Sequence, residues 1–268
     1  MAKMVPLDKT LDLNTKYRTE RDKFLIIRKI GTNVSDEIVV EVKETEVTYI
    51  HGDFAPLRVT SSNKLGPFDL KELYVVVPPD TTFQFTSASS GKVRIIGTIG
   101  ILRPGEGLSA DLLTRFDTQR DNHWRYLKDS VSLGTDEVWS ADRELTVLET
   151  TPRTNEEYTI NDIIMAKVTG GTISEGQVGI RLYLDTTPFD IEETESGHLG
   201  IDVLNMPYPP SDTNGETPFS LKNYPIVVPG DIKFKVGAIN ISGGDLTPAS
   251  GSAWTVEVLM PYRYKRKR

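Results

Sequence analysis

The chain contains no cysteine and only three histidines in 268 residues. Without cysteine it can form neither disulfides nor thiolate metal sites. Small secreted domains usually need such cross-links, so the sequence favours an intracellular origin. None of the histidines (His51, His123 and His198) lies in a metal motif such as HExxH. We read all three as surface or interface residues and expect no metal ion and no cofactor.

Long apolar runs and the common catalytic motifs are also missing. No stretch approaches the roughly 18 apolar residues of a membrane span, and the N-terminal MAKMVPLDKTLDL lacks the apolar core of a secretory signal. There is no GxSxG elbow, no Walker loop and no GxGxxG. The sequence therefore predicts a protein that is not an enzyme.

The body of the chain is mildly acidic, whereas its C-terminus is basic. The formal net charge is -7, and a mildly acidic body does not offer the basic face that nucleic-acid binding requires. The last residues, MPYRYKRKR, form a basic tail that could contact an acidic neighbouring subunit or, more weakly, nucleic acid. A solvated end that protects the last strand from edge pairing is the alternative. The cationic candidates are Arg263, Lys265, Arg266, Lys267 and Arg268.

One acidic segment, LDTTPFDIEETESG, is a candidate for binding a hard cation such as calcium, which requires several oxygen ligands close together. Its spacing is not that of an EF-hand, and a solvated acidic loop explains the same composition. The residues concerned are Asp185, Asp190, Glu192, Glu193 and Glu195.

The most informative feature is an internal repeat. The segment PFDLKELYVVVPPDTTFQF (residues 67–85) aligns without gaps, at an offset of 151, with PFSLKNYPIVVPGDIKFKV (residues 218–236). Nine of the nineteen positions are identical, where average composition gives about one by chance. Weaker similarities precede and follow this block in the same order. The sequence therefore predicts one structural unit present twice.

Each copy is rich in short, β-branched segments separated by turns. The turn signals Pro-Pro-Asp and Pro-Gly-Asp stand at matching places, and alternation in KFKVGAI and WTVEVLM is typical of strands with one buried face. Strands at this spacing, without alternating helices, predict an all-β protein of two tandem β-sandwich or jelly-roll-like units.

The segment between the copies is expected to be helical. A helical face is predicted from the spacing of Leu112, Phe116, Trp124, Leu127 and Val131. We expect unit 1 with an N-terminal arm over residues 1–106, a helical connector over 107–142, and unit 2 with the basic tail over 143–268.

The duplicated block PF-x-LK…VVP-x-D-x-x-F and the missing catalytic motifs indicate a resemblance to known proteins at the level of architecture. The chain resembles tandem jelly-roll capsid proteins and the β-sandwich decoration or tail proteins of viruses. The resemblance implies a virion component, assembled in the host cytoplasm, whose partners are copies of itself and other structural proteins. Polar ends such as residues 1–21 could act as arms that cross subunit boundaries. The alternative is a tandem β-sandwich binding module for carbohydrate or a receptor, which would present exposed aromatic side chains.

Overall fold

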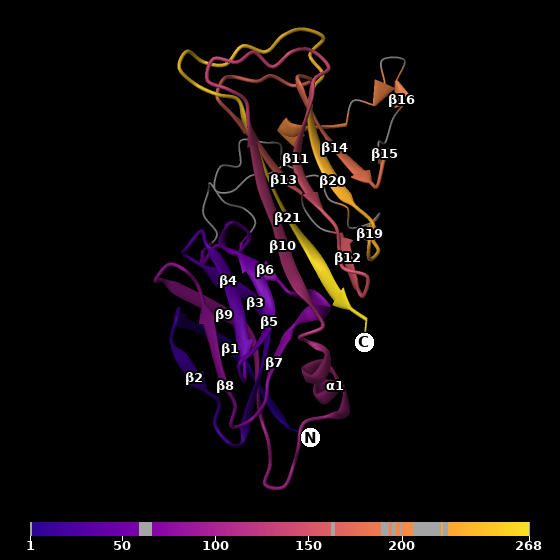
Figure 1. Cartoon of the computed structure of the whole chain (residues 1–268). Helices are drawn as coiled ribbons and strands as arrows, with labels where there is room; N and C mark the ends of the chain where they lie inside the picture. The colour runs from indigo at the N-terminus through magenta and orange to yellow at the C-terminus, as the bar shows by residue number, and fades with distance from the viewer. Residues whose placement is uncertain are drawn as a thin grey trace. The chain divides into compact units, whose positions relative to one another are not determined.

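The computed structural model describes residues 2–58, 66–161, 164–188, 193–194, 197–198, 200–205, 221 and 225–267. Within these residues the chain is mostly β-structure with a single α-helix, so the predicted all-β class is confirmed (Figure 1). The chain divides into two compact units. Unit 1 comprises Met1–Arg125 with Arg263–Arg266, and unit 2 comprises Tyr126–Tyr262 with Lys267–Arg268.

Unit 1 is built from nine strands in two antiparallel sheets. One sheet has the order β1-β9-β3-β6, with β7 also paired to β3, and the other has the order β2-β8-β4-β5. The strands are β1 (Lys3–Asp12), β2 (Lys16–Arg18), β3 (Lys23–Thr32), β4 (Glu37–Val42), β5 (Thr45–His51), β6 (Phe68–Asp69), β7 (Val75–Val77), β8 (Thr82–Thr86) and β9 (Lys92–Ile101).

Unit 2 has two sheets of the same kind. One has the order β10-β21-β12-β19, with β13 also on β21, and the other has the order β11-β20-β14-β15, with β18 also on β14. The strands are β10 (Asn122–Ser132), β11 (Glu144–Thr150), β12 (Glu156–Ile160), β13 (Met165–Thr169), β14 (Val178–Leu184), β15 (Thr187–Pro188), β18 (Ile201–Asp202), β19 (Ile226–Val228), β20 (Phe234–Asn240) and β21 (Thr255–Arg266). A separate two-stranded pair joins β16 (Glu193–Thr194) to β17 (Gly197–His198).

The two units share one topology. In each, the first strand (β1 or β10) lies beside the last (β9 or β21), which lies beside the third (β3 or β12). In the opposite sheet, the second strand (β2 or β11) lies beside the penultimate one (β8 or β20), which lies beside β4 or β14. The predicted duplication therefore extends to the order of the six strands that the two sandwiches have in common.

The repeated sequence block forms the same local structure in both copies. Strand β7 and strand β19 begin 151 residues apart, and each is followed by proline, a two-residue turn and the next long strand. Both turns end on an aspartate with a positive backbone angle, with φ of 53° at Asp80 and 65° at Asp231, a conformation that aspartate tolerates better than most residues. The prediction of strand, turn and strand is confirmed; residues 218–220 and 222–224 lie outside the described residues.

The predicted N-terminal arm is wrong. Residues 3–12 form β1, which pairs with β9 at ten consecutive positions. The side chains of Val5, Leu7 and Leu11 alternate with polar residues, which gives the strand one inward face. This alternation was present in the sequence but was overlooked because the segment is polar overall.

The predicted helical connector is only partly correct. Helix α1 covers Ala110–Thr118, and the chain then enters β10, which belongs to the sheet of unit 2. Of the residues expected to face protein, Trp124 is fully buried, whereas the side chains of Phe116 and Leu127 are half-buried. Pairing with β21 overrides the local helical spacing, because the partner strand lies far away in sequence and cannot be seen locally.

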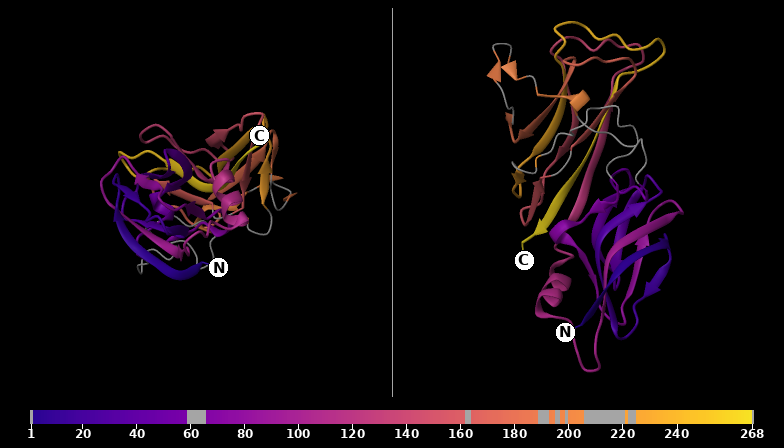
Figure 2. Two further views of the ribbon diagram at one scale, coloured as in Figure 1. Left: turned by 90° about the horizontal axis from the view of Figure 1, so that it is seen from below. Right: turned by 180° about the vertical axis from the view of Figure 1, so that it is seen from behind.

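Helix α1 is fixed to β7 by two polar side chains, and Figure 2 shows the helix as a magenta coil against the strands of unit 1. The Gln119 amide accepts a hydrogen bond from the Val76 backbone N–H and donates one to the Val76 carbonyl, at 2.9 and 3.1 Å. The Arg115 guanidinium donates to the carbonyl oxygens of Leu73, Tyr74 and Asn122. Burial lowers the pKa of Arg115 to about 10, so it stays charged at neutral pH.

Candidate interaction surfaces

The first residue of the predicted basic tail is part of the folded protein. Arg263 lies within β21, forms an ion pair with Glu72, and places its guanidinium 5.8 Å from the centre of the Trp124 ring. Partial burial lowers the pKa of Arg263. The neighbouring Tyr262 and Tyr264 side chains are each 4% exposed. Arg263 is therefore part of the folded end of β21.

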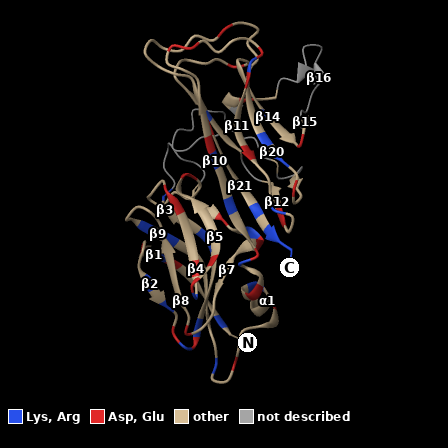
Figure 3. Ribbon diagram, in the orientation of Figure 1, with Lys and Arg blue, Asp and Glu red and all other residues tan. Residues whose placement is uncertain are grey.

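Lys265, Arg266 and Lys267 are exposed at the end of β21 or just after it, where Figure 3 shows a concentration of positive charge. The backbone of Arg266 donates a hydrogen bond to the Asp121 carbonyl at 2.8 Å. The Lys267 ammonium lies 3.5 Å from Glu157. The side chains of Lys265 and Arg266 face solvent, and Arg268 lies outside the described residues. The sequence predicted a basic tail. In the described residues, its exposed cationic side chains lie at the end of β21.

Two of the three histidines have defined structural roles. The His123 side chain is 1% exposed, with Nδ1 3.1 Å from the Gln119 carbonyl and Nε2 accepting from Arg125 Nε at 3.2 Å. Burial, aided by the nearby Arg125 charge, lowers the pKa of His123 to about 3. His51 is buried, and its Nδ1 accepts from the Asp53 backbone N–H. The expectation of surface histidines is wrong for both; the His198 side chain lies outside the described residues.

The structure describes little of the acidic segment. Asp185 occupies the turn between β14 and β15 with φ of 56°. Asp190, Glu192 and Glu195 lie outside the described residues, as does the side chain of Glu193. In the part of the chain that the structure does describe, no three acidic or histidine side chains converge in a way that could hold a metal ion.

Sequence reasoning missed a set of enlarged loops at one end of unit 2. In unit 1 the connections β1–β2, β3–β4 and β8–β9 are the short segments 13–15, 33–36 and 87–91. The equivalent connections in unit 2 are 133–143, 170–177 and 241–254. We call these three longer loops the loop platform. Their Gly-, Ser- and Asp-rich sequences (GGTISEGQ and ISGGDLTPASGSA) were the available signal.

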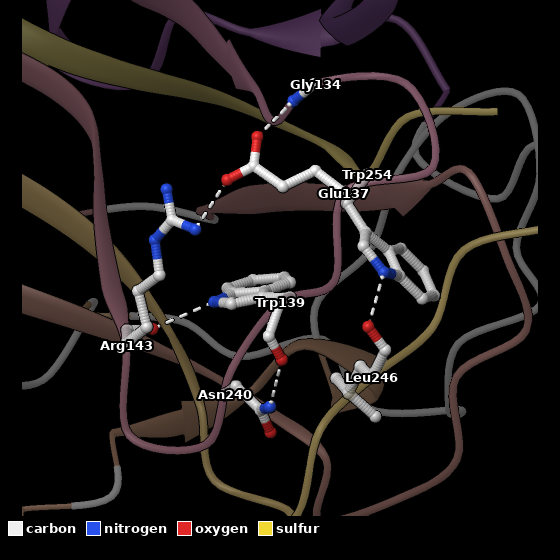
Figure 4. A network of polar contacts seen from close by, with 7 residues as sticks. All are labelled: Gly134, Glu137, Trp139, Arg143, Asn240, Leu246 and Trp254. Carbon is white, nitrogen blue, oxygen red and sulfur yellow. Dashed lines mark hydrogen bonds and ion pairs between the residues drawn. The ribbon is translucent and has the colours of Figure 1, made fainter.

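The loop platform is braced from within by two buried tryptophans (Figure 4). Trp139 Nε1 donates to the Arg143 carbonyl at 2.8 Å, and Trp254 Nε1 donates to the Leu246 carbonyl at 3.1 Å. Asn240, at the end of β20, donates to the carbonyl of Trp139 at 2.7 Å. These bonds satisfy buried polar groups and hold the loops in one arrangement.

Further hydrogen bonds join the three loops to one another. The Asp136 carboxylate accepts from the backbone N–H of Gly251 at 2.6 Å, and the Ala249 N–H donates to the Gly170 carbonyl at 2.7 Å. The backbone N–H of Ile241 donates to the Gln177 carbonyl at 2.9 Å. The loop platform is therefore a preformed surface, not a set of independent loops.

A polar cluster lies on the outer face of the sheet β11-β20-β14. The Glu144 carboxylate accepts hydrogen bonds from Tyr183 at 2.5 Å and Lys235 at 3.0 Å, with Arg181 at 3.3 Å. Burial raises the pKa of Glu144, but these three donors outweigh it and the net pKa is lowered. A side chain at Gly237 would place its Cβ 2.3 Å from the Glu144 carboxylate, so any larger residue there would displace the Glu144 side chain. The cluster links three strands, although the buried Nε of Arg181 has no hydrogen-bond partner in it.

Two of the hollows formed by the described residues lie in unit 1. One, of about 400 Å³, lies beside β2, β4 and β8 and is lined mainly by polar residues such as Lys16, Glu41 and Asp80. The other, of about 280 Å³, lies between the two sheets and is lined mainly by aliphatic side chains from β1, β3 and β9. We call the second hollow the apolar groove.

Comparison with known proteins assigns no family. No protein-family model matches the chain, and neither does any curated protein. Among solved structures, the crystal structure of the ANXUR1 extracellular domain from Arabidopsis thaliana is similar with a TM-score of 0.29 and 10% identity, over 98% of this chain and 83% of that one. A likeness at this level carries no argument about fold or function. In the described residues no helix is long and apolar enough to cross a membrane.

Proposed function

We propose that the chain is a non-catalytic structural subunit of a virus particle: a capsid, capsid-decorating or tail component that acts through contacts between folded surfaces. Its partners are copies of itself and other structural proteins of the particle. The observation that carries this proposal is the loop platform of unit 2.

The reasoning rests on how the two copies differ. Both keep the same strand order, whereas the three loops at one end are lengthened in unit 2 alone. Surface loops on a conserved scaffold are where binding contacts usually reside. Because the loop platform is already ordered by internal hydrogen bonds, it loses little conformational freedom on contact. Such a surface suits a contact repeated many times in a particle.

The exposed cations at the end of β21 supply a second contact in this proposal, with an acidic neighbour or with nucleic acid. A contact made by Lys265 and Arg266 depends on charge and weakens with salt, since the screening length falls to ~3 Å at 1 M. The arms expected from the sequence play no part, because β1 and β21 are built into their sheets.

The test compares loop variants by sedimentation velocity. Thr172→Arg and Ser250→Arg place a bulky cation on exposed positions of the loop platform, whereas Ser90→Arg makes the same change on an exposed position of the corresponding, shorter loop of unit 1. Both platform variants should shift the protein from large species to monomers, and Ser90→Arg should not. Assembly that tolerates both platform variants would contradict the proposal.

A ligand-binding module is the second candidate function. The buried tryptophans argue against a site in which sugars stack on tryptophan rings. Trp124, Trp139 and Trp254 are each at most 1% exposed, so no tryptophan offers a face for sugar stacking. A protein that stays monomeric at high concentration and binds a defined glycan would favour this candidate over assembly.

A further inference from the structure

The apolar groove of unit 1 has the composition of a ligand site. Its floor is formed by Leu7, Phe83 and Ile95, which are 2%, 5% and 1% exposed. Its walls are six side chains that are only half-buried: Val5, Leu11, Tyr17, Leu25, Ile99 and Ile101. Half-exposed apolar side chains scattered singly are normal, but their concentration around one opening marks a binding surface.

Strand register explains why these side chains meet. Val5 on β1 and Leu25 on β3 both pair with Ile99 on the central strand β9, so the three side chains form one aliphatic row across the sheet. The same face carries Leu7 and Leu11 on β1. The row faces β2 and β8 of the opposite sheet, which contribute Tyr17 and Phe83. The groove is therefore built mainly by strands of the two sheets, and Thr19 and Glu20 of the β2–β3 connection also line it.

A lysine is placed at the rim without a carboxylate partner. Lys9 lies between Leu7 and Leu11 on the groove side of β1, pairs in register with Ile95, and is exposed. The other two rim cations are already neutralised: Lys23 lies 2.7 Å from Glu20, and Arg18 lies 3.0 Å from Asp80. Among the described residues, no acidic side chain pairs with Lys9.

We propose that the apolar groove binds a free aliphatic monocarboxylate of medium chain length. The alkyl chain lies along the floor, and the carboxylate pairs with Lys9. The groove volume of about 280 Å³ is at the lower end of the roughly 300–1,000 Å³ typical of ligand pockets, which limits the chain length. This binding is independent of the assembly role, because the groove lies in unit 1 and the loop platform in unit 2.

The experiment titrates the full chain with octanoate and with octanol by isothermal calorimetry. Octanoate should bind saturably with a dissociation constant on the order of 1 mM or tighter, as expected for about ten non-hydrogen atoms. Octanol should bind about three- to fivefold more weakly, since it lacks the exposed ion pair with Lys9. The variant Lys9→Gln should lose this preference for the carboxylate, and Lys167→Gln in unit 2 should keep it.

A steric variant tests the groove directly. Val5→Trp fills the groove and should weaken octanoate binding at least about tenfold, whereas Thr10→Trp adds the same ring to the opposite face of β1 and should leave binding unchanged. Circular dichroism confirms folding; Leu11→Trp replaces Val5→Trp if the latter does not fold. Absence of saturable binding to wild-type protein, equal binding by Lys9→Gln, or binding to anionic phospholipid vesicles without binding to octanoate would each overturn the proposal.

Discussion

His123 should make stability depend on pH. Its pKa is about 3 in the folded protein and about 6.5 when unfolded. Between these values the unfolded chain binds the extra proton, so stability is fully present above pH 6.5 and is lost as pH falls toward 3. We expect a loss on the order of 2–4 kcal/mol between pH 7 and pH 4 from this residue.

Urea denaturation of wild-type protein and His123→Gln at both pH values measures that loss. Glutamine keeps one hydrogen-bonding side chain beside the Gln119 carbonyl but cannot be protonated. The variant should be less stable than the wild-type protein at pH 7, but its free energy of unfolding should depend less steeply on pH. An identical slope in both proteins would mean that other groups control acid unfolding.

Phe116 gives a second prediction at the residue scale. Full burial of this ring, as expected from the helical spacing, would make Phe116→Ala cost about 3–5 kcal/mol. The ring is half-buried beside the Lys43 ammonium, 5.5 Å from its centre, so we expect a smaller loss of about 1–2 kcal/mol. Thermal or chemical denaturation that gives a loss above about 3 kcal/mol would contradict the observed exposure.

At the scale of the elements, the attachment of α1 depends on Gln119. Its amide satisfies both polar groups of the Val76 backbone in a buried position, so Gln119→Ala leaves a donor and an acceptor unpaired. We expect a loss of about 2–4 kcal/mol in the free energy of unfolding. Thr118→Ala, one position away and exposed, should stay within about 0.5 kcal/mol. Equal effects of the two changes would show that the amide contributes little.

A deletion of β1 tests whether the N-terminal segment is a structural strand or an arm. Deleting residues 2–12 removes ten strand pairs with β9 and the buried Leu7 side chain, so unit 1 should fail to fold. Deleting residues 265–268 removes only the exposed end of β21 and should leave both units folded. Near-ultraviolet circular dichroism and amide hydrogen exchange measure both outcomes. A well-folded chain without residues 2–12 would restore the arm interpretation.

Sequence patterns predicted some elements well and others poorly, for physical reasons. The repeated block located β7, β8, β19 and β20, because turn residues and alternating apolar residues act locally. Strand β10 was taken for a helix because its partner β21 lies more than a hundred residues away. The bracing of the loop platform was not predictable either, since it includes contacts between residues distant in sequence, such as Asn240 with Trp139 and Gly251 with Asp136.

At the scale of the whole molecule, the central fact is one sandwich topology used twice with unequal loops. In both sandwiches the first strand lies beside the last strand, although β10 and β21 each contribute residues to both units. The loop platform of unit 2 is a feature in which the copies differ. In this account the duplication gives two similar sandwiches, and the lengthened loops of unit 2 make the contacts with other subunits.

The most direct test of the assembly role is the mass of the purified wild-type chain, measured by sedimentation velocity over a wide concentration range at low salt and at 1 M salt. The account predicts discrete species many times larger than the 29.9 kDa chain, formed at high concentration and reduced by high salt. A single species of 29.9 kDa at every concentration, with the other structural proteins of the particle also present, would contradict it.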